Sequence, residues 1–129
     1  MTALLLIIVF GFLAAILVPN FLKPNHQGSL TACKSNCRNL ATALEMYASD
    51  NGGYYPQTLS ELLPGHYLKI IPTCPMAGRD TYTDYVADGK KNLSFSCVGN
   101  NHANAYFSDK PCDNYPRYTA EQGLVNPPR

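Results

Sequence analysis

The first 22 residues carry no charged side chain, whereas all ten cationic and nine anionic side chains of the chain lie beyond Leu22. From Met1 to Val18 the apolar run is interrupted only by Thr2 and Gly11. An α-helix rises about 1.5 Å per residue, so this segment would extend roughly 33 Å, enough to cross a bilayer. We therefore expect residues 1–22 to form an apolar helix that needs either lipid or other helices around it. A secretory signal peptide fits poorly, because the run has neither a basic start nor an A-x-A-like cleavage site.

Two features distinguish this predicted helix from a uniformly apolar one. Gly11 and Ala15 form a small-x-x-x-small pair, with Ala14 beside it, and such a face lets a second helix approach closely. Pro19 removes one backbone donor and crowds the carbonyl four residues earlier, so we expect a kink or partial unwinding between Ala15 and Pro19. A plain membrane anchor with a tolerated proline is the alternative interpretation.

The remaining 107 or so residues suffice for one small domain. Residues 23–29 contain Pro24 and Gly28 and are expected to break the helix, leaving a head domain over 30–129. A second helix is then predicted, with Ser29 or Thr31 as its cap and Asp50 to Gly53 as its end. Its apolar residues form one stripe that should face a sheet: Leu30, Cys33, Cys37, Leu40, Leu44 and Tyr47.

Shorter elements complete the head. Thr58 and Glu61 form a capping box for a short helix. Alternating residues over 82–87 and 92–98, joined by a turn at 88–91, predict a β-hairpin, and 105–108 is a candidate third strand. Residues 109–129 are expected to be an ordered loop that fades into a tail. The predicted class is α+β, with helix packed on a small antiparallel sheet.

Five cysteines in so small a domain indicate an oxidising compartment outside the cytoplasmic membrane. Two disulfides and one free thiol can be arranged in fifteen ways, and the sequence does not choose among them. A metal site is disfavoured, because no C-x-x-C occurs and Cys33 and Cys37 are one helical turn apart. Haem attachment is excluded because C-x-x-C-H is missing.

Sequence motifs for catalysis are missing as well. His66 and His102 have no serine or cysteine nearby in a recognisable nucleophile motif, and no phosphate-binding glycine loop occurs. A net charge of +1, made of scattered charges, argues against a dedicated nucleic-acid surface. We therefore expect a protein that is not an enzyme and that needs no cofactor or metal.

The run from Gly11 to Phe21, GFLAAILVPNF, resembles the second half of the N-terminal helix of type IV pilins and type II secretion pseudopilins, usually close to GILAAIAIPNF. Residues 30–55, 67–82 and 114–125 are also similar to pilin-like proteins. The resemblance implies a pilin-like fold, with a long N-terminal helix broken near Pro19 to Gly28. It also implies the residues that pack in a filament core: Gly11, Ala14, Ala15, Pro19 and Phe21.

The function that the resemblance implies is structural. The chain would be the subunit of a homopolymeric type IV pilus-like filament, held in the bacterial cytoplasmic membrane before assembly and on the cell surface afterwards. Its partners would be copies of itself, the membrane and the pilus or secretion assembly machinery. A major pseudopilin of type II secretion is the first alternative. A membrane-tethered extracytoplasmic binding module that never polymerises is the second.

The resemblance also bears on the cysteines. Pilin-like relatives carry counterparts of Cys33, Cys74 and Cys97, whereas Cys37 and Cys112 look like additions in this chain. The pairing favoured on that basis joins Cys37 with Cys112 and Cys74 with Cys97, leaving Cys33 as a buried free thiol.

The start of the chain departs from the family. Aligned on the Gly-x-Leu-Ala-Ala block, the chain is about three residues short and lacks the glutamate usual at the fifth position. In the family that carboxylate is thought to neutralise the terminal amine of a neighbouring subunit. A charged amine in an apolar bundle is costly, so we expect the Met1 amine to be solvated, bonded to freed carbonyls or chemically neutralised.

Overall fold

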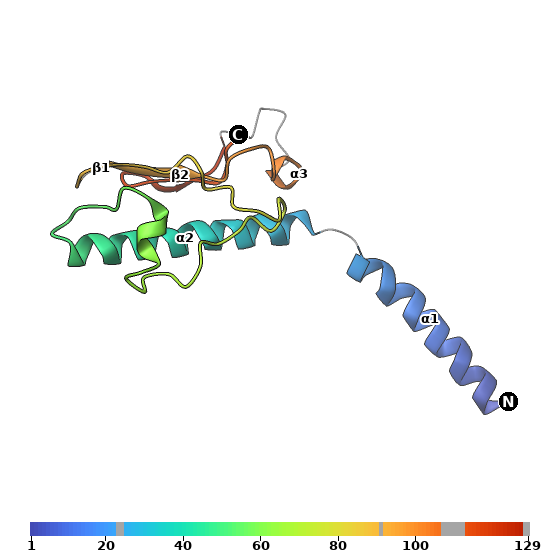
Figure 1. The fold of residues 1–129 in the computed structure, drawn as a ribbon. Coiled ribbons are helices and arrows are strands. Elements are labelled where there is room, and N and C mark those ends of the chain that lie inside the picture. Colours follow the sequence, from blue (N-terminus) through green and yellow to red (C-terminus); the bar gives the residue numbers. More distant parts are fainter. Residues whose placement is uncertain (23–24, 91, 107–112, 128–129) are drawn as a thin grey trace.

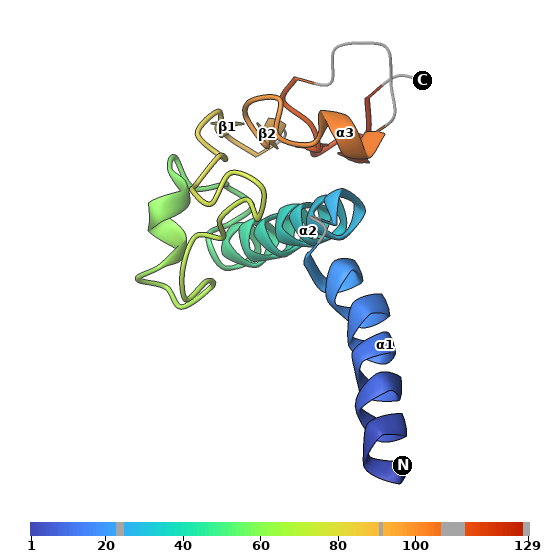
Figure 2. The same ribbon diagram turned by 90° about the vertical axis from the view of Figure 1, so that its right-hand side faces the viewer.

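The chain folds into two consecutive helices followed by a small antiparallel sheet, an α+β architecture (Figure 1). This computed structural model describes the chain apart from residues 23–24, 91, 107–112 and 128–129, and for residues 18–22 it describes the backbone alone. Figures 1 and 2 show that one helix lies along one face of the sheet while the first helix extends away from this head.

Helix α1 spans Thr2–Leu22 and helix α2 spans His26–Asp50, with 21 and 25 residues. Two consecutive helices agree with the predicted break near Pro19 to Gly28, but the N-terminal helix is not the long one that the resemblance implies. The prediction for the turn before Pro19 is a kink or partial unwinding. α1 continues as helix through Pro19, so the unwinding does not occur, and the kink stays a prediction. Within the described part of the chain, no helix combines the length and the apolarity that crossing a membrane requires.

α2 begins four residues earlier than predicted, because Asn25 caps it. The Asn25 side chain accepts a hydrogen bond from the backbone N–H of Gly28 at 2.9 Å, which satisfies one of the free donors of the first turn. The predicted caps Ser29 and Thr31 therefore lie inside the helix. Residues 26–29 of the joint predicted at 23–29 belong to α2 as well. The predicted end is confirmed: Asn51 is the C-terminal cap and Gly52 follows with a φ of 66°.

The predicted apolar stripe of α2 is confirmed and forms the core with the inner face of the sheet. Leu40 and Leu44 have no exposed surface, and Phe95 on the sheet is 1% exposed. Phe95 stacks on Tyr118 with 5.4 Å between ring centroids and meets the edge of Tyr82 at 6.2 Å. Aromatic pairs at such distances add to the free energy gained by burial alone. The other stripe residues are buried or partly buried: Leu30, Cys33, Cys37 and Tyr47.

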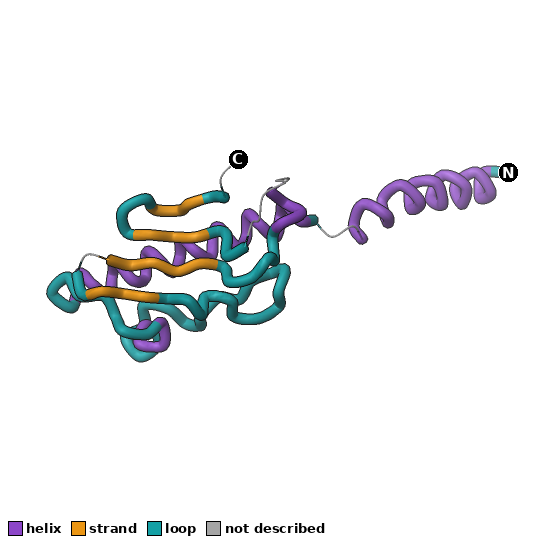
Figure 3. The backbone as a smooth tube through the Cα atoms, turned by 90° about the horizontal axis from the view of Figure 1, so that it is seen from above, coloured by secondary structure: helices purple, strands orange, loops and turns teal. Residues whose placement is uncertain are grey.

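The sheet has four short antiparallel strands in the order β1-β2-β3-β4 (Figure 3). Strands β1 (Val86–Asp88) and β2 (Asn92–Ser96) pair through Ala87 and Leu93, which confirms the predicted hairpin. Strands β3 (Arg117–Thr119) and β4 (Gly123–Val125) extend the sheet from β2.

Two predictions for the second half of the head are wrong. Residues 105–106, predicted to begin a strand, belong to helix α3 (Ala103–Tyr106), and residues 107–108 lie outside the described residues. The segment 109–129, predicted as a loop, contains β3 and β4. A strand of three residues is too short to show the alternation of apolar and polar residues that predicts a strand. Such strands form because a neighbouring strand pairs with them. The short helix after Pro56 is confirmed as the 3-10 helix η1 (Leu59–Leu62), with the Thr58 backbone N–H bonded to Glu61 Oε1 at 2.9 Å.

Candidate functional site

Four potential metal ligands from separate parts of the head meet in the core. Cys33 lies on α2, Cys74 in a tight turn before the sheet, Cys97 directly after β2, and His102 directly before α3. Their sulfur atoms and a ring nitrogen all lie within 4.8 Å of one another. The three cysteines have no exposed surface and His102 is 2% exposed. We call this group the Cys3His cluster.

Local backbone structure presents each of these side chains to the cluster. The Cys74 backbone N–H donates to Arg79 O at 3.0 Å, and the Gly78 N–H donates to Cys74 O at 2.8 Å, so a closed turn holds Cys74. Gly78 has a φ of 64°, a conformation that glycine adopts without strain. Beyond β2, the Cys97 backbone N–H donates to Pro116 O at 2.9 Å and keeps this cysteine next to β3.

Polar groups surround the sulfur atoms. The hydroxyl of Tyr82 lies 3.3 Å from Cys33 Sγ, and the hydroxyl of Thr81 lies 3.2 Å from Cys97 Sγ. The Asn101 side-chain amide donates to Cys97 Sγ at 3.5 Å. Cys97 therefore already accepts a hydrogen bond, which is the role that a thiolate prefers.

The protein environment raises the pKa of all three thiols. The pKa of Cys33 is raised to about 12, chiefly by its hydrogen bond with Cys37 and further by burial, against a lowering contact with Cys97. The pKa of Cys97 is also raised to about 12, by its hydrogen bond with Cys33 and by burial. Burial raises the pKa of Cys74. Without a cation beside them, these groups are neutral thiols near pH 7, and thiols are poor nucleophiles.

The described cysteines Cys33, Cys37, Cys74 and Cys97 are all free thiols in this structure. Cys33 is buried, as expected for the predicted free thiol, but it shares the cluster with Cys74 and Cys97, the predicted disulfide partners. Cys112, the predicted partner of Cys37, lies outside the described residues. The two disulfides stay predictions.

The sequence reasoning considered His102 only as a catalytic residue and missed its place beside the cysteines. The signal that was available is the spacing of Cys97 and His102, with four residues between them, which matches a common spacing of zinc ligands. Cys33 and Cys74 join them only through tertiary structure.

The second notable feature is the surface of α1. Its large apolar side chains from Leu4 to Leu17 are between 48% and 71% exposed. A Cβ atom added at Gly11 would meet nothing within 4 Å, so the predicted small face is open. Ala14 and Ala15 are exposed as well, whereas the side chains of Pro19 and Phe21 lie outside the described residues. The structure therefore leaves Gly11, Ala14 and Ala15 uncovered by the head.

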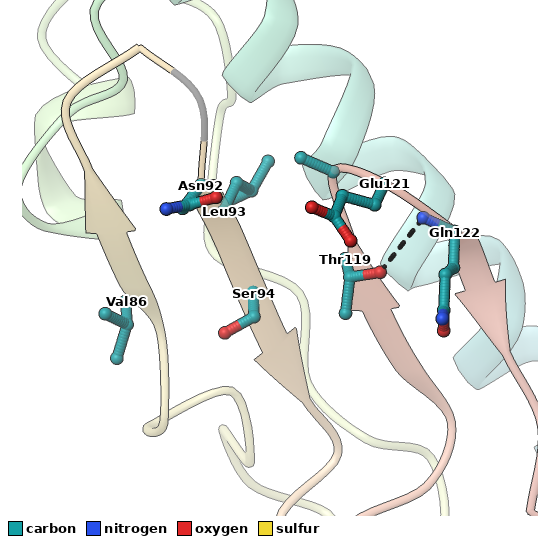
Figure 4. A pocket seen from close by; sticks show the side chains of 8 residues that line it. Val86, Asn92, Leu93, Ser94, Thr119, Glu121 and Gln122 are labelled. Atoms are coloured by element: carbon teal, nitrogen blue, oxygen red, sulfur yellow. Dashed lines mark hydrogen bonds between the residues drawn. The ribbon is translucent and has the colours of Figure 1, made fainter.

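A surface hollow of about 310 Å³ lies on the outer face of the sheet, near the turn between β3 and β4 (Figure 4). Val86, Ser94 and Thr119 stand side by side in the strand register, and Thr119 Oγ1 accepts a hydrogen bond from the Gln122 backbone N–H at 3.1 Å. Of the described residues that line the hollow, only Glu121 carries a charge.

In comparisons with known proteins, no family model, curated protein or solved structure matched the chain.

Proposed function

We propose that this protein is the structural subunit of a type IV pilus-like filament built from copies of the chain. The observation that carries the proposal is the exposed α1, whose side chains are uncharged throughout and apolar on all sides. Burial of apolar surface is favourable by about 25 cal/mol per Å². A helix of this kind is stable only when something covers it, and α1 copies from neighbouring subunits provide a matching surface.

The small residues of α1 favour a helix as the covering partner. Gly11 and Ala15 are separated by one helical turn and leave the backbone open to close approach. In a lipid environment alone these small residues would have no packing advantage. Their presence on an otherwise bulky helix supports helix-to-helix contact in a filament core.

The head supports the same proposal. α2 packs on one face of a four-stranded antiparallel sheet. α1, which precedes α2 in the chain, extends away from that sheet (Figures 1 and 2). An assembly with α1 in the centre would place the heads outside. Before assembly, lipid of the bacterial cytoplasmic membrane would shield α1, and a pilus or secretion machine would move the subunit into the filament.

The test is electron microscopy of sheared cell-surface material from cells that express the chain, with identification of the fibre protein. Wild-type cells should yield fibres made of this chain. The Gly11→Leu variant should yield few or none, because the larger side chain blocks close helix packing. Val9→Leu is the control, since it lies on the opposite side of α1 and should preserve fibres.

Gly11→Leu fibres of normal abundance would contradict the proposed packing. Short fibres confined to the cell envelope of a secreting strain would instead identify the pseudopilin alternative. If the chain is instead a tethered binding module, it should be monomeric in wild-type cells and in both variants.

A further inference from the structure

We propose that Cys33, Cys74, Cys97 and His102 bind one zinc ion that fastens the loops of the head to α2. The number and type of the ligand atoms suit a tetrahedral site, and the atoms lie close together. Zinc binds cysteine sulfur at about 2.3 Å and histidine nitrogen at about 2.0 to 2.1 Å, which places the ligand atoms roughly 3.5 to 3.8 Å apart. Cys74 Sγ and His102 Nε2 are already 3.4 Å apart, and all four ligand atoms lie within 4.8 Å of one another.

The orientation of His102 supports a metal. Its Nε2 atom points at the sulfur of Cys74. A buried imidazole usually satisfies its polar atoms with strong donors or acceptors, and sulfur of a neutral thiol is a weak one. A zinc ion at Nε2 gives this nitrogen a strong partner.

Hydrogen-bond donors around the sulfur atoms fit thiolates rather than thiols. Three thiolates and one zinc ion carry a net charge of about −1, which must be stabilised in a buried site. The hydroxyls of Tyr82 and Thr81 and the amide of Asn101 can all donate to sulfur.

A disulfide between Cys74 and Cys97 would use two of the same sulfur atoms. Such a disulfide would leave Cys33 and His102 without a bonding role, whereas a tetrahedrally coordinated zinc ion binds all four groups. Binding of zinc releases the three thiol protons to solvent, so the metal competes with protons and binds more tightly as pH rises. Because all four ligands are buried, no position remains open for a substrate, and the site is structural.

The proposed ion would join three separate parts of the head. Cys74 lies in the loop before the sheet, His102 lies between β2 and α3, and Cys33 lies on α2. A domain of this size has a modest hydrophobic core and gains much of its stability from such a clamp. This inference does not depend on the filament proposal.

The test uses the full chain, purified in detergent under reducing conditions and free of chelator. Zn²⁺ should bind with one ion per chain by native mass spectrometry and should displace about three protons, measured in weakly buffered solution. Co²⁺ should give the visible absorption of a tetrahedral site together with sulfur-to-metal charge transfer. A chelator should remove the bound ion, abolish the cobalt absorption and lower the melting temperature of the chain.

Variants separate the cluster from non-specific thiol binding. Cys74→Ser should weaken Zn²⁺ binding by about 100-fold or more. Cys37→Ser is the matched control. Cys37 is equally buried and contacts Cys33 but is not one of the four ligands, and serine keeps a hydrogen-bonding group at this position, so this variant should keep one ion per chain. His102→Cys should also keep one ion and should strengthen the sulfur-to-cobalt absorption, a gain that loss of folding cannot produce.

Two results would overturn the proposal. One is a reduced, folded wild-type chain that binds no Zn²⁺ or Co²⁺ in a one-to-one ratio. The other is equal loss of the metal in Cys37→Ser and Cys74→Ser together with an unchanged cobalt spectrum in His102→Cys.

Discussion

The Nε2 atom of His102 lies 3.4 Å from the Sγ atom of Cys74, although the two residues are 28 positions apart in the chain. The contact joins the turn before the sheet to the loop that leads into α3. Neither segment has a regular pattern of its own, so the contact depends on the packing of both against α2. A group of four potential metal ligands thus arises from tertiary structure, and the spacing of Cys97 and His102 is its one local signal among the described residues.

The first prediction concerns the reactivity of the buried thiols. In the reduced, metal-free chain at pH 8, alkylation of Cys33 and Cys97 should be on the order of 10³-fold slower than in denaturant, because a pKa of about 12 leaves very little thiolate. The measurement is mass spectrometry of time-resolved alkylation with peptide mapping. Equal rates in the folded and denatured chain would show that these thiols are exposed.

The second prediction concerns alkaline stability. Burial raises the pKa of Tyr55 to about 12, with a smaller contribution from its hydrogen bond to Glu45 Oε1 at 2.8 Å. A folded-state pKa above the ordinary value of about 10 means that the neutral phenol stabilises the fold below pH 10 and that this contribution is lost from pH 10 to 12.

Tyr55→Phe should therefore lose less stability than the wild type between pH 10 and 12. Thermal unfolding across this range measures the difference. Tyr54→Phe is the control, because Tyr54 is adjacent and 56% exposed, and it should follow the wild-type profile. A Tyr55→Phe profile that parallels the wild type would refute the assignment.

The third prediction concerns the start of α2. Asn25→Ala should destabilise the chain by about 1 kcal/mol, because the first turn loses the acceptor for the Gly28 N–H. Asn25→Asp keeps an acceptor and should retain most of the stability. Denaturant unfolding followed by circular dichroism provides the comparison. Equal stability of Asn25→Ala and wild type would show that the cap contributes nothing.

The sequence predicted the elements that have a strong local signal. The α2 stripe, its glycine-rich end, the capping box at Thr58 and the hairpin around Gly89 all follow from periodicity or turn chemistry. The start of α2 was placed too late because Pro24 and Gly28 suggested a longer break, whereas Asn25 provides a cap that makes a glycine in the first turn acceptable.

The parts that sequence reasoning missed depend on distant partners. β3 and β4 have three residues each and form because β2 offers its free edge. The Cys3His cluster needs α2, two loops and α3 together, so only the Cys97 and His102 pair was visible locally. The exposed apolar surface of α1, in contrast, followed directly from its lack of charge.

The most direct test of the filament proposal is a cryo-electron microscopy structure, at side-chain resolution, of fibres isolated from the cell surface. We predict fibres of this chain in which α1 helices form the core and the Gly11 and Ala15 face of one copy contacts α1 of a neighbour. Fibres that leave α1 at the surface and are joined only through the heads would contradict the account, as would a cell-surface fraction in which this chain is monomeric.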